Sequence, residues 1–247
     1  DDDSLDISSA DTIGSVDGEM LAAIQGHGRF DGTMELLGHT IDGRYRVDRL
    51  IGKGGFAQVY KCCQLSVGRN VAVKVLTAEL TSREEIVRRF EAEAQIVSRL
   101  KHPNTLKLFD FGRISDGRLY IVTELLDGRP VDRVLREACI DQKRLALWLK
   151  QICGAIQEAH DEGIFHRDLK PSNLYLESLG GGDFVKVLDF GIAKVADTKQ
   201  TTSGVIMGTP SYMSPEQVEA RAMDHRTDLY SLGVIAYEAV TGQAPFT

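Results

Sequence analysis

The pattern of apolar and polar positions changes at Tyr45. Beyond it, three segments alternate or run apolar, are rich in β-branched residues and are separated by glycines; they cover 45–51, 57–64 and 70–77. This pattern predicts three successive antiparallel strands. Apolar residues at helical spacing follow over 82–101, with Ser82 as the expected N-cap and Pro103 as the stop signal.

Two more strands and several helices are predicted further along the chain. Segments 105–112 and 118–125 have strand patterns. Helical patterns cover 131–138, 141–163 and 228–242, and short strands are expected on both sides of 166–173 and at 184–190. Residues 192–215 lack periodicity, which in a compact domain is typical of a functional loop. The sequence thus predicts an α+β protein with a β-rich lobe at 45–125 and a mainly α lobe at 126–247. A cleft between two such lobes is a common ligand site.

Composition separates residues 1–44 from this body. They hold ten acidic residues against two arginines, a balance of −8, whereas the whole chain of 247 residues has a net charge of −7. Asp, Ser and Gly dominate and aromatic residues are few, so we expect a disordered acidic tail. The nearly neutral body lacks the basic face of a nucleic-acid-binding protein, and no nucleic-acid partner is expected.

Cysteine spacing and apolar runs exclude two further classes. Cys62, Cys63, Cys139 and Cys153 lack the paired spacing of a zinc site and are ordinary for a reduced cytosolic protein. No apolar run approaches the ~20 residues of a membrane span, and no signal peptide is visible. Because the chain starts without Met and ends at "GQAPFT", we expect a fragment of a cytoplasmic protein. A membrane anchor beyond residue 247 stays open.

A glycine-rich turn, "IGKGGFAQVY", joins the first two predicted strands. Gly52, Gly54 and Gly55 would let backbone N–H groups approach a polyphosphate, although hairpin chemistry is the commoner reason for such glycines. Ala57 stands where a G-x-G-x-x-G pattern has its third glycine. Because the turn precedes a strand instead of a helix, the dinucleotide-binding fingerprint does not fit.

Lys74 ends an apolar strand, and Glu93 lies on the predicted helix 19 residues later. An unpaired ammonium is costly to bury. A Lys74–Glu93 pair would direct the ammonium towards phosphates. The alternative is a lysine at the strand edge whose amine reaches water.

The octet "HRDLKPSN" at 166–173 combines an acid, a base and an amide. Asp168 is a candidate base for a substrate hydroxyl, and Lys170 is a candidate for neutralising charge on a moving phosphoryl group. Asn173 offers an oxygen to Mg²⁺, and Asp189, which follows a strand in "LDFG", is a candidate second ligand. A polar turn for the octet and a strand-end turn for Asp189 are the simpler alternatives.

Hydroxyl side chains gather in the aperiodic segment, at Thr198, Thr201, Thr202 and Ser203. Arg167, beside Asp168, is a candidate partner for a phosphate added to this segment. The alternative is a surface loop of ordinary Ser and Thr content.

Taken in order, these motifs resemble the eukaryotic-like (Hanks-type) serine/threonine protein kinases, and the lead-in "IDGRYRVDRLIGKGGFAQVY" is similar to the bacterial branch. The resemblance covers about 45–247 and includes "GKGGFAQV", "VAVK", Glu93, "HRDLKPSN", "DFG", "GTPSYMSPE" and Asp228. It implies the two-lobed protein kinase fold. It also implies transfer of the γ-phosphoryl of ATP, with Mg²⁺ or Mn²⁺, to Ser or Thr hydroxyls of proteins. Autophosphorylation of the loop through self-association follows from the same resemblance.

The resemblance assigns a role to each site residue. The catalytic set is Asp168 as base, Lys170, and Lys74 paired with Glu93 on the α/β-phosphates. The metal ligands are Asn173 and Asp189. The nucleotide contacts, besides Lys74, are Ile51, Gly52, Gly54, Gly55, Val59, Ala72, Glu124, Leu126 and Tyr175. Of these, Glu124 and Leu126, after a small Thr123, would offer backbone hydrogen bonds to adenine. The regulatory residues are Arg167, Thr201, Thr202, Ser203 and Thr209. A stacked spine of Val97, Leu108, His166 and Phe190 is also implied.

Several departures from the family pattern carry expectations. Tyr175 stands where an aliphatic residue usually floors the adenine, and Ser172 replaces an acid that reads substrate arginines in some kinases. Truncation within the large lobe would remove the arginine expected to pair with Glu216, so the fragment alone is expected to be marginally stable and inactive. The alternatives are a pseudokinase that binds nucleotide as a scaffold, and a small-molecule phosphotransferase. The complete catalytic set argues against the first and the "GTPSY" segment against the second.

Overall fold

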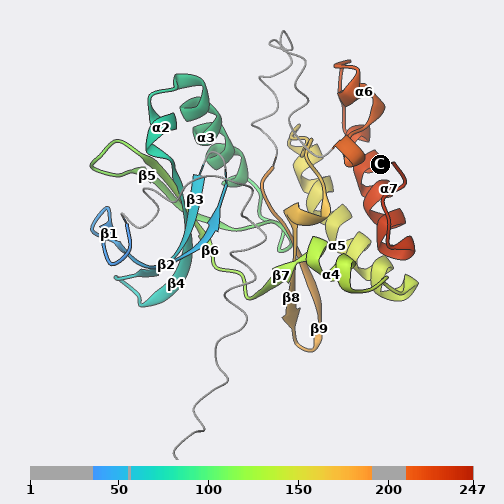
Figure 1. The fold of residues 1–247 in the computed structure, drawn as a ribbon, viewed down its shortest axis with the longest axis horizontal. Helices are drawn as coiled ribbons and strands as arrows, with labels where there is room; N and C mark the ends of the chain where they lie inside the picture. Colours follow the sequence, from blue (N-terminus) through green and yellow to red (C-terminus); the bar gives the residue numbers. More distant parts are fainter. Residues whose placement is uncertain (1–35, 55–56, 191–209, 247) are drawn as a thin grey trace, which may run out of the picture.

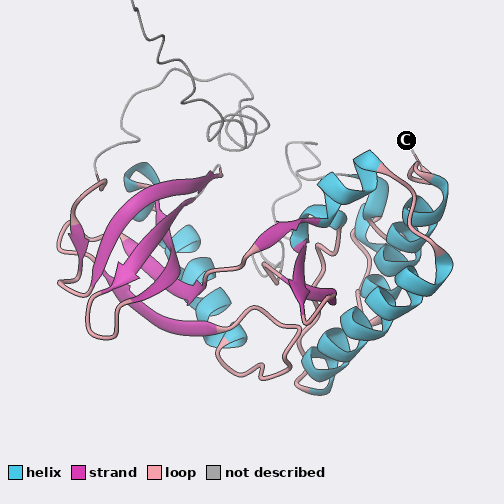
Figure 2. Cartoon of the chain, turned by 90° about the horizontal axis from the view of Figure 1, so that it is seen from below, coloured by secondary structure: helices cyan, strands magenta, loops and turns pink. Residues whose placement is uncertain are grey.

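The computed structural model describes residues 36–54, 57–190 and 210–246. A β-sheet lobe and a mainly helical lobe lie side by side and are joined by a short crossover after strand β6 (Figure 1). Figure 2 shows most strands in one lobe and most helices in the other. The predicted α+β, two-lobed architecture is therefore confirmed. None of the helices in these residues is long and apolar enough to cross a membrane.

An antiparallel sheet of six strands forms the small lobe, in the order β1-β2-β3-β4-β6-β5. Its strands are β1 (Thr40–Ile41), β2 (Tyr45–Lys53), β3 (Ala57–Gln64), β4 (Arg69–Leu76), β5 (Leu108–Arg113) and β6 (Leu119–Glu124). The last five agree with the sequence pattern. Strand β1 was not predicted and lies within the segment assigned to the acidic tail. Leu36 and Ile41 are buried against the sheet. The acidic composition of residues 1–44, taken as a whole, did not reveal these two buried positions.

Helices α2 (Ala78–Thr81) and α3 (Glu84–Val97) follow β4. Phe90 and Ala94 of α3 are buried in a cluster with residues of the sheet, as the helical spacing required. The prediction of Ser82 as the N-cap of α3 is wrong, because Ser82 is the C-cap residue of the additional helix α2. Arg83 precedes α3 without a side-chain cap.

The large lobe combines helices with a small antiparallel sheet, ordered β7-β8-β9. Its elements are β7 (Gly128–Pro130), α4 (Val131–Glu137), α5 (Gln142–Asp161), the 3₁₀ turn Pro171–Asn173, β8 (Leu174–Leu179), β9 (Gly182–Val187), the 3₁₀ turn Pro210–Tyr212, α6 (Pro215–Val218) and α7 (Arg226–Thr241). Asp141 begins α5 as its N-cap, since its carboxylate accepts the backbone N–H groups of Lys143 and Arg144. Strand β8 follows the octet, but residues 162–170 form no strand, so the strand expected before the octet is wrong.

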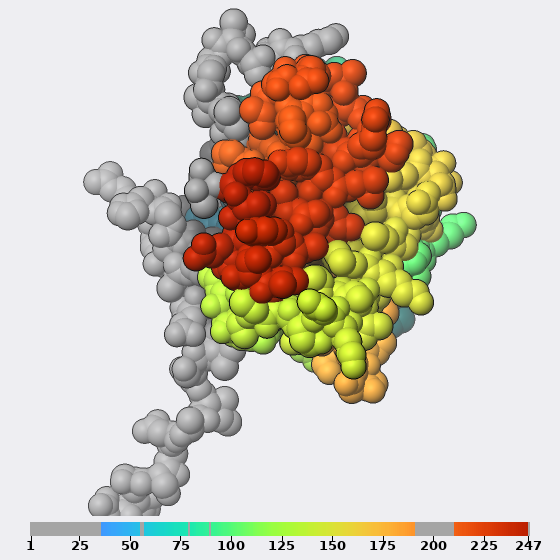
Figure 3. Space-filling view, turned by 90° about the vertical axis from the view of Figure 1, so that its right-hand side faces the viewer, coloured from blue at the N-terminus to red at the C-terminus, as the bar shows by residue number. Residues whose placement is uncertain are grey.

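The large-lobe core is built around α5 and α7 and reaches Val97 at the end of α3. Figure 3 shows α7 and α6, in red and orange, at the outer surface of this lobe. Leu229, Tyr237 and Val240 of α7 are about half exposed. One face of α7 therefore packs on the core while the other presents apolar side chains to solvent.

Candidate active site

A mainly apolar cavity of about 250 Å³ lies between the two lobes. Eight of the residues expected around a nucleotide line it: Ile51, Gly52, Val59, Ala72, Lys74, Glu124, Leu126 and Tyr175. Gly54 is not among the lining residues, and Gly55 lies outside the described residues. The sequence analysis missed Thr105, Leu106, Ile121, Leu125, Val187 and Leu188, which also line the cavity. Leu188 belongs to "LDFG" but had no role assigned to it, and the other five residues lie in no motif, so only tertiary pairing brings them to the cavity.

The glycine-rich turn forms a hairpin between β2 and β3. Gly52 lies opposite Val59 in the register, and the N–H of Gly54 donates to the carbonyl of Ala57 at 2.9 Å. The methyl group of Ala57 is buried in the cluster that packs on α3. The alanine that departs from the family pattern therefore belongs to the small-lobe core.

Lys74 lies between two carboxylates from distant parts of the chain. Its Nζ is 2.7 Å from Oε1 of Glu93 on α3 and 3.1 Å from Oδ1 of Asp189, which follows β9. Burial disfavours the ammonium, but the negative charges of Asp189 and Glu93 raise the pKa of Lys74 above its usual value. Lys74 is consequently a fixed cation at the wall of the cavity.

Asp189 occupies a strained backbone position at the mouth of the cavity. Its φ of 40° lies in the left-handed region, which costs a non-glycine residue on the order of 1–3 kcal/mol. The positive charge of Lys74 lowers the pKa of Asp189, so this carboxylate is ionised. With 55% of its side chain exposed, it is also accessible.

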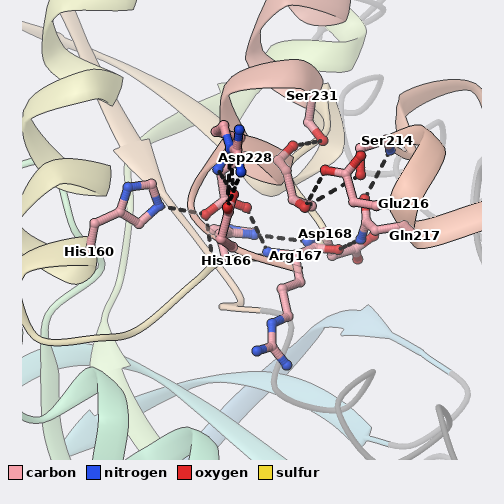
Figure 4. A network of polar contacts seen from close by, with 12 residues as sticks. His160, His166, Arg167, Asp168, Ser214, Glu216, Gln217, Asp228 and Ser231 are labelled. Atoms are coloured by element: carbon pink, nitrogen blue, oxygen red, sulfur yellow. Dashed lines mark hydrogen bonds and ion pairs between the residues drawn. The ribbon is translucent and has the colours of Figure 1, made fainter. Parts of the chain in front are cut away.

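The octet is held by one buried acid of α7, Asp228 (Figure 4). Its Oδ2 accepts the backbone N–H of His166 and the Nε2–H of His160, and its Oδ1 accepts the N–H of Arg167, each at 2.8 Å. The backbone N–H groups of His166 and Arg167 therefore donate to Asp228 instead of to a neighbouring strand. They also stabilise Arg167 at a φ of 60°.

Asp168, Lys170 and Asn173 meet at the end of this segment. Nζ of Lys170 is 2.9 Å from Oδ2 of Asp168, and Nδ2 of Asn173 donates to the backbone oxygen of Asp168 at 2.8 Å. Nδ2 also lies 3.2 Å from the Asp168 carboxylate. Because the amide nitrogen of Asn173 is engaged with Asp168, its Oδ1 is the atom available to a cation.

His166 links the octet to the segment that carries Asp189. Its Nε2 lies 2.8 Å from the carbonyl of Leu188, while Nδ1 accepts the N–H of Asp168 at 3.3 Å. A carbonyl only accepts and an amide only donates, so His166 is the neutral Nε2–H tautomer. Its ring centroid lies 4.8 Å from that of Phe190. Val97 and Phe190 are buried in one core cluster and Leu108 packs against it, so the four expected spine residues lie together.

Arg167 extends away from the Asp228 network in Figure 4. Its backbone oxygen accepts from Nε2 of Gln217 at 2.7 Å. Its buried Nε has no hydrogen-bond partner among the described residues. The predicted phosphorylation sites Thr201, Thr202 and Ser203, together with Thr209, lie outside the described residues.

Glu216, for which an arginine partner was expected, accepts a hydrogen bond from Oγ1 of Thr227 at 2.8 Å. The same threonine lies 3.4 Å from the hydroxyl of the fully buried Ser214. Ser214 and Gln217 form a capping box at the start of α6. The "SPE" sequence thus joins α6 to α7 through hydroxyl groups.

The donor set fits a nucleotide with a divalent cation. Among the described residues, no three His, Cys, Asp or Glu side chains form a metal site of their own. Asn173 and Asp189 would instead supply two oxygen ligands, the arrangement in which Mg²⁺ takes its remaining ligands from phosphates and water. The apolar cavity beside Lys74 fits the base of the same nucleotide.

Comparison with known proteins places the chain in a family. The sequence model of the protein kinase domain matches residues 45–247. The chain therefore belongs to the protein kinase family, as the order of its motifs implied.

Several curated relatives are serine/threonine-protein kinases of bacteria. Serine/threonine-protein kinase pkn3 of Myxococcus xanthus is 45% identical over 221 residues, 87% of this chain and 40% of that protein. Pkn1 of the same organism is 47% identical over 207 residues, 83% of this chain and 30% of that protein. PknA of Mycobacterium tuberculosis is 43% identical over 216 residues, 85% of this chain and 49% of that protein. The chain thus spans less than half the length of these relatives.

Proposed function

We propose that the protein transfers the γ-phosphoryl group of ATP to Ser or Thr hydroxyls of protein substrates. The observation that carries this proposal is the position of Lys74, whose ammonium is hydrogen-bonded to Glu93 and Asp189 at once. A kinase needs its phosphate-binding cation and its metal-binding carboxylate fixed together, since the reaction is mainly one of positioning and charge stabilisation.

The side chains divide the work of phosphoryl transfer. Asp168 accepts or orients the proton of the substrate hydroxyl, whose oxygen attacks the γ-phosphorus. Lys170, 2.9 Å from that carboxylate, neutralises charge on the moving phosphoryl group. Lys74 neutralises the phosphates that leave as ADP.

Asn173 and Asp189 would hold Mg²⁺, or Mn²⁺ in its place. The bound ion supplies positive charge that neutralises the phosphates. The lowered pKa of Asp189 supports this role, because the carboxylate is ionised before a cation arrives.

We also propose that the protein is regulated by autophosphorylation at Thr201, Thr202 or Ser203, with Thr209 shaping the acceptor site. The support is Arg167, a partly buried arginine whose buried Nε lacks a hydrogen-bond partner among the described residues. A phosphate beside a guanidinium forms charge-assisted hydrogen bonds that order a loop. Alanine at all three positions should abolish activation by preincubation with ATP; unchanged activation would contradict this assignment.

We propose a domain organisation of an N-terminal tail, a small lobe up to residue 125 and a large lobe at 126–247; the sequence pattern alone put the end of the tail at residue 44. The support for the lobe boundary is the crossover between the end of β6 at Glu124 and the start of β7 at Gly128. Strand β1 favours a tail that ends before Thr40.

The test is transfer of labelled γ-phosphate by the full-length protein beside its Asp168→Asn variant. A general base contributes about 10²–10⁴-fold in rate, so the variant should lose nearly all transfer. Label found by mass spectrometry on Ser or Thr, in the wild type only, supports the proposal. Equal and negligible transfer by both proteins, with ATP still bound, would establish the pseudokinase alternative instead.

A further inference from the structure

Three side chains of the β7-β8-β9 sheet contact the crossover between the lobes, residues 124–128. Lys186 bonds to Glu124, Glu177 to the backbone of Asp127, and Tyr175 to the backbone of Gly128. Glu124, Leu125 and Leu126 of the crossover line the nucleotide cavity. The sheet therefore contacts the crossover, which forms one wall of the cavity, at both the start and the end of the crossover.

Lys186 makes the contact at the first end. Its side chain is 9% exposed, and its Nζ lies 2.6 Å from Oε1 of Glu124. The same oxygen accepts the N–H of Lys107 at 2.7 Å, and the N–H of Glu124 donates to the carbonyl of Lys107 at 3.0 Å. A lysine is almost never buried without a partner, so this charge pair constrains where the end of β6 lies.

Tyr175 and Glu177 make the contacts at the second end. The hydroxyl of Tyr175 donates to the carbonyl of Gly128, and the N–H of Asp127 donates to Oε1 of Glu177, each at 2.8 Å. A Cβ on Gly128 would lie 2.0 Å from the carbonyl oxygen of Leu176. Gly128 thus allows the crossover to approach β8 closely enough for both bonds.

The register explains why these three side chains act on the same segment. Tyr175 lies directly opposite Lys186 across β8 and β9. Directly opposite residues point to one face of a sheet, and so do residues two apart on a strand, which places Glu177 on that face too. The chain leaves β9 at Val187 and reaches Asp189 two residues later, so one small sheet supports the crossover, Tyr175 in the cavity wall and the segment that carries the proposed metal ligand.

We propose that Lys186, Tyr175 and Glu177 are positioning residues that preorganise the crossover for the base of the nucleotide. This inference rests on the proposed function only for the identity of the ligand, ATP. Backbone groups of residues 124–126 recognise a base only if their donors and acceptors are held in place before it arrives. Fixing a binding segment beforehand increases affinity, because less ordering is required on binding. The contacts touch no reacting atom, so they should affect ATP affinity and leave the chemical step unchanged.

The experiment measures the Kd of ATP by calorimetry without turnover, and then KM and kcat, on the full-length protein. Lys186→Met keeps the aliphatic stem and removes the charge, while Lys186→Arg restores it. We expect Lys186→Met to weaken ATP binding about tenfold, and Lys186→Arg to recover most of the loss, because truncating one partner of a buried charge pair leaves the other unpaired. Tyr175→Phe removes one hydrogen bond and should weaken binding about two- to tenfold. The value of kcat at saturating ATP should stay within about threefold of wild type in Lys186→Met and Lys186→Arg, since Lys186 does not line the cavity.

The selectivity for ATP over GTP distinguishes preorganisation of the crossover from a general loss of stability, which would not change this selectivity. A preorganised crossover rejects guanine, whose donors and acceptors differ, whereas a loosened one adapts to it. The ratio of the GTP and ATP dissociation constants should therefore fall in Lys186→Met and Tyr175→Phe. Lys150→Met, which removes an exposed lysine of α5, should leave affinity and ratio at the wild-type values.

The outcomes separate this inference from the proposed function. A wild type that transfers phosphate, with folded Lys186→Met and Tyr175→Phe variants of wild-type ATP affinity, overturns the inference alone. Weakened ATP binding by both variants supports the inference even if no transfer is seen. If Lys186→Met fails to fold, the less disruptive variant Tyr175→Phe is used alone to test the inference. Wild-type ATP affinity and wild-type selectivity for ATP over GTP in that variant would overturn the inference.

Discussion

Nζ of Lys74 lies 3.1 Å from Oδ1 of Asp189, although 115 residues separate them in the chain. The contact joins β4 of the small lobe to the segment after β9 of the large lobe. Because the same ammonium is 2.7 Å from Glu93, helix α3 meets both elements at one point. A displacement of any of the three would separate the charges that the proposed chemistry requires.

Lys74→Met should reduce phosphate transfer about 10²–10³-fold, the effect typical of removing one electrostatic stabiliser from an active site. Glu93→Gln should reduce it less, because Lys74 keeps its bond to Asp189. Labelled γ-phosphate transfer at saturating ATP measures both, with Lys150→Met as the control for loss of a lysine charge. Equal losses in Glu93→Gln and Lys74→Met would show that orientation of Lys74 matters more than its charge.

Asp228→Asn should destabilise the large lobe. The carboxylate accepts three hydrogen bonds, and replacing one oxygen by an NH₂ group turns a donor towards His166, His160 or Arg167. A buried donor without an acceptor costs about 1–3 kcal/mol. Urea denaturation gives the free energy of unfolding. Asp224→Asn, at an exposed pair with Arg226, should produce a smaller change.

Acid should destabilise the fold through His166 before the carboxylates titrate. Burial lowers the pKa of His166 below its usual value of 6.5. Below pH 6.5 the unfolded chain therefore binds a proton that the folded protein excludes, and the free energy of unfolding falls with pH. This loss of stability should begin as the pH falls through 6.5, and it should be absent at pH 7.5.

The variant His166→Phe isolates this contribution, since it keeps a ring against Phe190 and cannot titrate. Its free energy of unfolding should be lower than that of wild type at pH 7.5, but it should change less between pH 7.5 and 5.5. Equal pH dependence in the two proteins would mean that His166 is not excluded from protonation in the fold.

Trp148, the single tryptophan of the chain, should report unfolding of the large lobe by fluorescence. It is 2% exposed, and its Nε1 donates to Oδ2 of Asp183 at 2.6 Å. Asp183 also pairs with the partly exposed Arg144, so Asp183→Asn should cost about 1 kcal/mol.

The effect of Asp183→Asn should depend on pH in a defined direction. Hydrogen bonding from Arg144 lowers the pKa of Asp183 below 3.8. The stabilising charge is thus present above pH 3.8 and is lost as the pH falls through the lowered pKa, so wild type and variant should converge in acid. Asp132→Asn, at a surface pair with Arg136, serves as control.

Two glycine substitutions should change stability in opposite directions. In Gly128→Ala the new methyl group would lie 2.0 Å from a backbone oxygen, so the crossover must move, at a cost of about 1–3 kcal/mol. Gly233 of α7 has open space around its Cβ position, and Gly233→Ala should stabilise the helix by about 1 kcal/mol. Urea denaturation compares both with wild type. A stable Gly128→Ala variant with wild-type ATP affinity would contradict the close approach described for β7 and β8.

Periodicity and local motifs predicted much of the fold, because they depend on residues close in sequence. The alternating segments predicted strands β2 to β6. The helical spacing of apolar residues predicted helices α3, α5 and α7, with bounds within a few residues of those observed. The octet and "LDFG" identified the polar residues of the proposed site, since each motif combines groups that one chemistry needs, but only Leu188, Asp189 and Phe190 of "LDFG" line the cavity. Capping was less predictable: Ser82 has the right side chain for an N-cap, but four more residues of helix precede it.

Only the tertiary structure decided which distant residues touch. Nothing local in Lys186 distinguishes it from other lysines of a strand, yet the pairing of β8 with β9 places it against Glu124. Nor does the composition of the first 44 residues reveal Ile41, whose burial depends on the strands that it packs against. Contacts between segments 60 or more residues apart arise from sheet register and lobe packing, which follow from many weak interactions over the whole chain.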